Sequence, residues 1–492
     1  MFCKILTKLL FRGKRILLVM KIFLPIRATP RIYLFFIAVL LKITASALSA
    51  VGFVLVSPGF AISGTAVWLA FFAVLLLVAS PQVDVFLADR WHWLKPAALT
   101  ITGFFCAIGI LLLVLMTTIG LSHVRSDKPG SEISRLMVSL DNVFGYNDAT
   151  ALTHQAASNL LDGRNPYASS NTVNAMLRFY GRTDKLTPLR VGRFADVFPY
   201  PTPAQLESLW QDAIKDPSRV PPELESKFNY PAGCFLLPAA FIGMGIGDLR
   251  LVYVIFLIPA LGYAVYRVPK EYRLFFIAAV VASVELWSSL AAGETGFLYF
   301  PFLLLAWVLY RRNIWASAVF MGIVLATKQV TWFILPFYII VVWRTLSPQR
   351  ALGAIGIIAG VFVAANAWFF AVDPQLWLSS IFAPMVEKMF PIGVGIITPV
   401  TTGMLDVRSP LPFTILEFVV MVGSLAWYHF NCRRYPETGP VLSMLPLFLA
   451  WRSLWGYFFY VDIIILASIL INEYGKPRER YIEMALASEA GR

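Results

Sequence analysis

Long apolar segments separated by short polar ones recur along most of this sequence. The first three cover residues 32–56, 67–88 and 98–121, and each reaches the ~20 residues that a helix needs to cross a hydrocarbon core of about 30 Å. After a polar stretch at residues 122–230, apolar segments resume and continue to residue 472. The pattern predicts an all-α polytopic membrane protein with about twelve transmembrane helices.

Composition supports this interpretation. The chain is 58% hydrophobic and only 14% charged, and a soluble chain of 492 residues would need far more polar surface. The net charge of +13 does not indicate a nucleic-acid partner. Its basic residues lie mainly in short segments between apolar ones, as expected for loops that stay on the cytoplasmic side of a membrane.

The distribution of charge also predicts the topology. The first 31 residues carry eight basic residues and the first acid is Asp84, so the N-terminus is expected to lie on an anionic cytoplasmic surface. Pro25, Arg27 and Pro30 interrupt the apolar stretch there, which argues against a cleavable signal peptide. Five later basic segments are then also cytoplasmic, namely residues 267–273, 311–312, 344–350, 433–434 and 476–480. Both termini are predicted inside and residues 122–230 outside.

The expected division of the chain follows from this topology. It comprises a basic cytoplasmic N-terminal segment (1–31), three N-terminal transmembrane helices (32–121), an extracytoplasmic loop (122–230), a transmembrane bundle (231–472) and a cytoplasmic tail (473–492). The apolar segment 231–247 is short and contains Pro238, and it is expected to be re-entrant or interfacial. Short spans such as 315–327 suggest helices that end at a water-filled cavity. We find no internal repeat, which argues against transporters built from repeated halves.

The outer loop is expected to be ordered and to carry interfacial helices. A helix is predicted after Asn147 or Asp148, either of which can cap it, and Gly163 follows its end. A second helix begins at Thr202, which forms a capping-box pattern with Gln205. Amphipathic helices beside transmembrane spans tend to lie in the interface plane.

Acids near the outer ends of the spans are candidates for catalysis. Asp148 lies at a predicted helix N-terminus, where an ionised carboxylate is favoured and can accept a proton from a hydroxyl nucleophile. The alternative role for Asp148 is a simple helix cap, and Asp141 is the alternative base. Glu294, in the sequence G-E-T-G, is either a pocket acid or part of a solvated turn.

Cations at the same end predict an anionic substrate. Lys328 and Gln329 interrupt the apolar stretch 315–343. A lysine at membrane depth is costly and suggests function, although it can also extend to the interface. Arg452, at the predicted outer mouth of the last span, suits bidentate phosphate binding. Two outward cations beside an acid predict a lipid-linked anionic substrate.

The sequence does not indicate a metal or redox site. The four cysteines are scattered without a C-x-x-C pair, and the outer loop contains no D-x-D. No cofactor is therefore expected, while a bound divalent cation is left open.

Four segments, in order, resemble a known family. Residues 148–167 (D-A-T-A-L-T-H-Q-A-A-S-N-L-L-D-G-R-N-P-Y) combine an acid, a helix and a G-x-N-P-Y turn that contains Asn165 and Tyr167. Tyr230 opens a Y-P segment, residues 326–336 carry a lysine at a helix end, and residues 452–457 form a late R-S-x-x-x-Y element. Together these resemble the GT-C superfamily of membrane glycosyltransferases, and most closely the polyprenyl-phosphate-mannose-dependent family 87. The chain departs from that family in two extra N-terminal spans and in lacking a tyrosine shortly after the acid.

The resemblance implies a GT-C-like bundle that transfers a mannose-like sugar, with inversion, from a polyprenyl-phosphate donor to a lipid or glycan acceptor outside the cytoplasm. It implies that Asp148, or else Asp141, is the general base and that Lys328 and Arg452 contact the donor phosphate. The other implied substrate contacts are Gln329, Glu294, Asn165, Tyr167 and Tyr230. It also implies a bacterial cell (inner) membrane as the location.

Two other classes of function stay open. One is a transporter or flippase of lipid-linked saccharides, which twelve spans and charge at the membrane midplane would suit. The other is a non-catalytic membrane scaffold whose outer loop binds partners.

Overall fold

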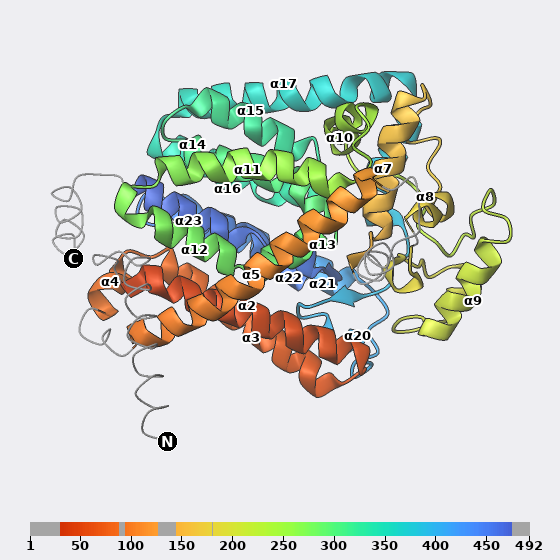
Figure 1. Ribbon diagram of the computed structural model, residues 1–492, viewed down its shortest axis with the longest axis horizontal. Coiled ribbons are helices and arrows are strands. Elements are labelled where there is room, and N and C mark those ends of the chain that lie inside the picture. The colour runs from red at the N-terminus through yellow and green to blue at the C-terminus, as the bar shows by residue number, and fades with distance from the viewer. Residues whose placement is uncertain (1–29, 88–93, 126–143, 180, 475–492) are drawn as a thin grey trace.

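The computed structural model describes residues 30–87, 94–125, 144–179 and 181–474. Within these ranges the chain is mostly helical, and its only sheet joins β1 (Ile392–Gly393) to β2 (Arg452–Ser453) in parallel. Most of the helices run along the long axis of the molecule (Figure 1). The predicted all-α class is therefore confirmed.

The helices follow the apolar pattern of the sequence. Those before the outer loop are α2 (Pro30–Val54), α3 (Pro58–Val78), α4 (Gln82–Leu87) and α5 (Leu94–Arg125). Those of the outer loop are α7 (Asp148–Leu161), α8 (Thr172–Arg178) and α9 (Pro203–Ala213). The helices that follow the outer loop, up to the long helix α17, are α10 (Gly233–Gly243), α11 (Leu249–Arg267), α12 (Arg273–Ala282), α13 (Val284–Ala291), α14 (Phe300–Leu309), α15 (Ile314–Leu325), α16 (Leu335–Thr345) and α17 (Pro348–Val372). The last helices are α18 (Pro374–Ile381), α19 (Ala383–Val386), α20 (Thr398–Thr401), α21 (Leu411–Asn431), α22 (Gly439–Leu449) and α23 (Val461–Asn472).

Several of these helices can cross a bilayer. Six in the described part of the chain are long and apolar enough to do so, or seven if α12 and α13, bent by 51° at Ser283, form one broken span. Other apolar helices are shorter, and the 12 residues of α15 rise roughly 18 Å, less than the ~30 Å of the hydrocarbon core. The structure thus supports a helical membrane protein, and the count of twelve spans stays a prediction.

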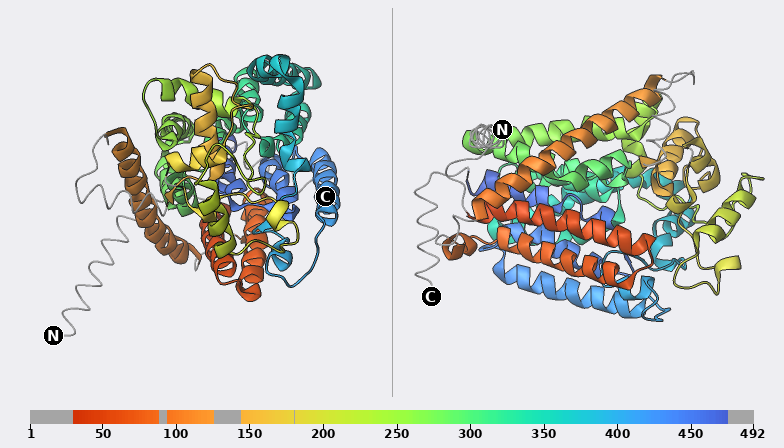
Figure 2. Two further views of the ribbon diagram at one scale, coloured as in Figure 1. Left: turned by 90° about the vertical axis from the view of Figure 1, so that its right-hand side faces the viewer. Right: turned by 60° about the horizontal axis from the view of Figure 1, so that its bottom comes forward.

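The connecting segments gather at two opposite ends of the bundle. At one end, the Arg31 guanidinium lies 3.0 Å from the Asp84 carboxylate and also pairs with Glu473. At the other end, α7, α8 and α9 lie beyond the long helices, as the right-hand view of Figure 2 shows.

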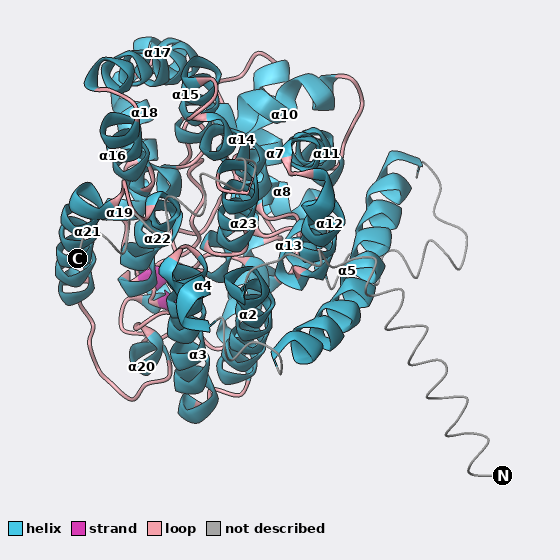
Figure 3. Cartoon of the chain, turned by 90° about the vertical axis from the view of Figure 1, so that its left-hand side faces the viewer, coloured by secondary structure: helices cyan, strands magenta, loops and turns pink. Residues whose placement is uncertain are grey.

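The centre of the bundle is α23, every residue of which is buried. Figure 3, which looks onto the end that carries α4, shows α23 surrounded by other helices, with α5 at the margin. A buried ion pair joins α2 to this centre, because the Lys42 ammonium lies 2.6 Å from the Asp462 carboxylate. Lys42 also donates to the Ser283 hydroxyl at 3.0 Å, at the bend between α12 and α13. The hairpin α2–α3 is therefore an integral part of the bundle.

The helix α10 begins and ends at the same end of the bundle. Just before it, the Asn229 carbonyl accepts a hydrogen bond from Gln329, and just after it, Asp248 accepts one from Tyr146. With 11 residues and Pro238 inside it, α10 is also short. The re-entrant or interfacial placement of residues 231–247 stays a prediction.

The local signals in the outer loop act as their chemistry predicts. Asn147 caps α7, since its side chain accepts from the Thr150 amide. Thr202 and Gln205 form the reciprocal capping box of α9. The apolar face of α9, which includes Leu209 and Trp210, is buried against the protein.

Candidate active site

Asp148 is buried at the start of α7, where only 7% of its surface is exposed. Because Asn147 is the cap, the Asp148 side chain can turn toward the chain segment around Thr187. One carboxylate oxygen accepts from the Thr187 amide at 2.5 Å and the other from the Ala149 amide at 2.8 Å. Burial raises the pKa of Asp148, and the hydrogen bonds from Thr187 and Ala149 and the charge of Arg452 lower it in part. The result is a partly stabilised carboxyl that can take up a proton.

Glu294 lies beside Asp148, in the turn between α13 and the 3-10 helix at Thr295–Leu298. The Asn147 amide donates to the Glu294 carboxylate at 3.4 Å, so the cap of α7 contacts this second acid. Burial raises the pKa of Glu294, while the charge of Lys328 lowers it most strongly among the opposing effects. The two acids and Lys328 therefore share one electrostatic environment.

Lys328 lies at the break between α15 and the 3-10 helix Gln329–Phe333. Its ammonium donates to the Thr295 hydroxyl at 2.7 Å and lies 4.7 Å from the centre of the Tyr230 ring. Burial lowers the pKa of Lys328, and the charge of Glu294 is the largest influence that raises it. An ammonium has three donors, and Thr295 takes one of them, so donors are left for an anionic ligand.

Arg452 is held by the short β1–β2 sheet. Gly393, with φ at +142°, pairs there with Ser453, and a Cβ at that glycine would lie 2.2 Å from the Ser453 carbonyl oxygen. Trp451 donates from its indole to the Met389 carbonyl at 3.0 Å, which fixes the backbone just before the arginine. The Arg452 guanidinium makes no hydrogen bond or ion pair with any described residue, yet its charge lowers the pKa of Asp148. It is a half-buried cation available to an anion.

Glu225 is a third buried acid that sequence reasoning did not single out. Burial raises the pKa of Glu225 to about 8. The charge of Arg452 opposes this rise, and the charge of Asp148 adds to it. Its backbone amide donates to the Thr187 carbonyl, so Thr187 bonds to both acids. Glu225 lies in a polar loop segment, P-P-E-L-E-S-K, where nothing in the sequence distinguishes it from solvated acids.

The site therefore combines three carboxyl groups with two cations at one end of the bundle. The acids come from α7, the α13 turn and the outer loop, and the cations from the start of the 3-10 helix after α15 and from β2. Burial raises the pKa of Tyr200 to about 12, and the charge of Arg452 opposes this rise. A set of this kind can bind a phosphate through its cations and take a proton from a hydroxyl through a carboxylate.

The four other residues predicted to contact substrate have hydrogen-bond or ring partners of their own. Gln329 donates to the Asn229 carbonyl and, at 2.9 Å, to the Ile381 carbonyl, so it connects three segments around the site. Asn165 accepts from the Tyr167 amide at 3.1 Å and stabilises the turn after α7. Tyr167 donates to the Tyr230 carbonyl at 3.0 Å. Tyr230 alone of the four reaches one of the cations, through its ring under Lys328.

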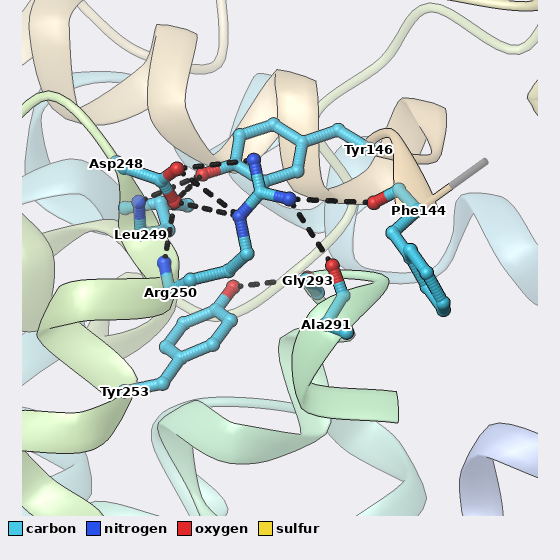
Figure 4. A network of polar contacts seen from close by, with 8 residues as sticks. All are labelled: Phe144, Tyr146, Asp248, Leu249, Arg250, Tyr253, Ala291 and Gly293. Carbon is cyan, nitrogen blue, oxygen red and sulfur yellow. Dashed lines mark hydrogen bonds and ion pairs between the residues drawn. The ribbon is translucent and has the colours of Figure 1, made fainter. Parts of the chain in front are cut away.

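A buried network supports the turn that carries Glu294 (Figure 4). Tyr146, two residues before Asp148, donates from its hydroxyl to Asp248 at 2.5 Å. Arg250 pairs with Asp248 at 3.0 Å and donates to the Ala291 carbonyl at 3.1 Å. The network thereby links the start of α7, the start of α11 and the end of α13, and holds the segments of Asp148 and Glu294 together.

The alternative base, Asp141, lies outside the described residues, so the choice between Asp148 and Asp141 stays a prediction. Among the residues that the structure describes, no three His, Cys, Asp or Glu side chains are grouped so that they could hold a metal ion.

Comparison with known proteins does not identify a family. No protein-family model, no curated protein and no solved structure matches this chain.

Proposed function

We propose that this protein is a GT-C-type membrane glycosyltransferase, which transfers a mannose-like sugar from a polyprenyl-phosphate donor to a lipid or glycan acceptor on the extracytoplasmic face. The observation that carries the proposal is the convergence of Lys328 and Arg452 with Asp148, Glu294 and Glu225 at one end of an apolar helical bundle. A lipid phosphate needs cations at the level where the helices end, and a hydroxyl acceptor needs a base beside them. The proposal includes about twelve spans, with both termini in the cytoplasm of a bacterial cell.

In the proposed reaction, the donor phosphate lies between Lys328 and Arg452. The acceptor oxygen forms a bond to the anomeric carbon as the bond from that carbon to the phosphate oxygen breaks. The acceptor proton moves to Asp148, and the electron pair of the broken bond stays on the polyprenyl phosphate. Cations fixed in place before the reaction stabilise the charge that develops on such a leaving group.

Asp148 suits the base better than Glu294 for a geometric reason. Both of its oxygens accept backbone N–H groups, which fix the carboxylate and partly offset the effect of burial on its pKa. Glu294 instead shares its environment with Lys328 and Asn147, and is placed to orient the sugar or the lysine.

The proposal is tested by incubating purified protein in proteoliposomes with a panel of radiolabelled polyprenyl-phosphate sugars and crude envelope acceptors. Transfer by the wild type, lost in Asp148→Asn and Lys328→Ala and kept in Asp162→Asn, supports the enzyme. Asp162 is the matched control because it follows the same helix but is exposed and pairs with Arg164. Absence of transfer from every donor would contradict the proposal.

A second candidate is a transporter or flippase of lipid-linked saccharides, and one observation favours it. The Lys42–Asp462 pair lies within the apolar bundle, and ionisable residues at membrane depth often belong to transport pathways. Movement of labelled lipid across the bilayer without sugar transfer, abolished in Lys42→Met and unchanged in Asp148→Asn, would favour the transporter.

A further inference from the structure

A second cluster of cations surrounds a cavity between the outer loop and the segment that joins α19 to α21, separate from the candidate active site. The cavity is half open, has a volume of about 230 Å³, and is lined by Arg190, Lys388 and Arg408 together with the segment from Ala195 to Phe198. Pockets for drug-sized ligands occupy about 300–1,000 Å³, so this one suits a single small group. Its lining carries three cations and one carboxylate, Asp196.

Hydrogen bonds join the three segments that carry these cations. The Arg190 amide donates to the Lys388 carbonyl at 2.7 Å, and the Arg190 guanidinium donates to the Arg408 carbonyl at 3.0 Å. The Arg408 guanidinium lies 5.3 Å from the centre of the Phe198 ring and pairs with Asp406 at 2.9 Å. The Lys388 ammonium makes no hydrogen bond or ion pair with a described residue. Even with Asp196 and Asp406 counted against the three cations, one positive charge remains, so the cavity favours an anion.

Exposed apolar side chains lie close in sequence to two of the three cations. Met385 and Val386, just before Lys388, are 70% and 73% exposed. Met404 and Leu405, just before Arg408, are 55% and 51% exposed. Arg408 itself lies three residues before α21, one of the helices long enough to cross a membrane. Apolar side chains beside cations at the end of a span are the arrangement of a membrane interface, where acyl chains meet phosphates.

We infer that this cavity binds the phosphate of an anionic lipid in the outer leaflet. These apolar residues contact the acyl chains, and Arg190, Lys388 and Arg408 contact the headgroup phosphate. The segment from Thr187 to Arg190 connects this site to Asp148, since Thr187 donates to that carboxylate. Three residues of extended chain span at most ~11 Å, so a lipid bound here lies close to the candidate active site. The inference concerns binding alone and does not depend on the proposed sugar transfer.

The test uses photo-crosslinking in nanodiscs, with diazirine-bearing phosphatidylglycerol compared with the same probe on phosphatidylcholine. Labelled peptides are mapped by mass spectrometry. We expect phosphatidylglycerol to label residues 381–390 and 404–411 more strongly than phosphatidylcholine. Lys388→Ala with Arg408→Ala should reduce that labelling by roughly fivefold for each charge removed.

The matched control is Arg164→Ala, because Arg164 is also an exposed arginine paired with an aspartate two residues earlier. Both altered residues of the test variant are exposed, so loss of fold is not expected, and thermal unfolding checks this. Equal labelling by the two lipids, or labelling unchanged in the double variant, would overturn the inference. Binding of inorganic phosphate to detergent-solubilised protein, without preferential lipid labelling, would assign the cavity to a soluble phosphoryl ligand and also overturn it.

Discussion

The buried pair formed by Asp248 and Arg250 gives the sharpest prediction of stability. Only 2% of either side chain is exposed, and the carboxylate accepts from the guanidinium, from the Arg250 amide at 2.8 Å and from the Tyr146 hydroxyl. Asp248→Asn keeps the size of the side chain but removes the buried negative charge that pairs with Arg250 at 3.0 Å. Removal of one partner from a buried pair costs about 3–5 kcal/mol.

The chain contains a matched control with the same spacing. Asp162 and Arg164 form an ion pair at 2.6 Å, also two residues apart, but 60% and 56% of their side chains are exposed. Exposed pairs contribute roughly 0–1 kcal/mol, so Asp162→Asn should lower the free energy of unfolding by less than ~1 kcal/mol. The difference in unfolding free energy between Asp248→Asn and Asp162→Asn therefore isolates the effect of burial on an ion pair.

The free energies of unfolding are measured by SDS titration in mixed micelles, for both single variants and for a double-mutant cycle. The double variant Asp248→Asn with Arg250→Met removes both charges of the pair. We therefore expect its loss of unfolding free energy to be smaller, by ~2 kcal/mol or more, than the sum of the losses in the two single variants. A cost for Asp248→Asn no larger than that for Asp162→Asn, or additive costs in the cycle, would refute this account of the network.

Three further predictions concern the Lys42–Asp462 pair, the buried carboxyl of Glu225 and the close backbone contact at Gly395. Lys42→Met should lower the free energy of unfolding by about 3–5 kcal/mol because it leaves the Asp462 carboxylate buried without its partner, and adding Asp462→Leu should restore much of the loss, as SDS titration can measure. Burial raises the pKa of Glu225 to about 8, so the folded protein keeps a proton there that the unfolded chain loses near about pH 4.3, and stability should fall as pH rises between these values. Glu225→Gln should reduce that fall, measured as unfolding midpoints at about pH 5 and 8. Gly395→Ala should weaken phosphate binding near β2 because its Cβ would lie 1.8 Å from a carbonyl oxygen, whereas Gly423→Ala, which meets nothing within 4 Å, should leave binding unchanged.

The sequence predicted the parts of the fold that local patterns determine. Apolar runs predicted the helical bundle, and the capping residues Asn147 and Thr202 predicted the starts of α7 and α9. The break at Lys328 was visible because a lysine and a glutamine interrupt an apolar stretch. Each of these signals depends on residues close together in the chain.

The parts that the sequence did not predict depend on contacts between distant segments. Glu225 reaches the site only because residues 187 and 225 pair across the outer loop. Lys42 and Asp462 lie 420 residues apart, and the sequence around either residue does not show that the other is its partner. A lysine in the middle of a predicted span was nevertheless a usable signal, since such a charge needs a partner within the bundle.

The number of transmembrane spans does not follow from the sequence either, for a different reason. Hydropathy identifies apolar segments, but a helix of 10–12 residues such as α14 or α15 does not by itself cross a bilayer. Whether such helices stop at a cavity or pair end to end depends on their tertiary arrangement.

In the proposed function, Lys328 and Arg452 bind the phosphate of a polyprenyl donor. The most direct test of this role is the equilibrium binding of polyprenyl phosphate, the leaving group shared by every such donor, to the protein in nanodiscs. Since a hydrogen bond to a charged group contributes about 1.5–3 kcal/mol, Arg452→Ala should weaken binding by roughly tenfold to a hundredfold, while Arg164→Ala should leave it unchanged. Equal affinities of the wild type and Arg452→Ala would contradict the claim.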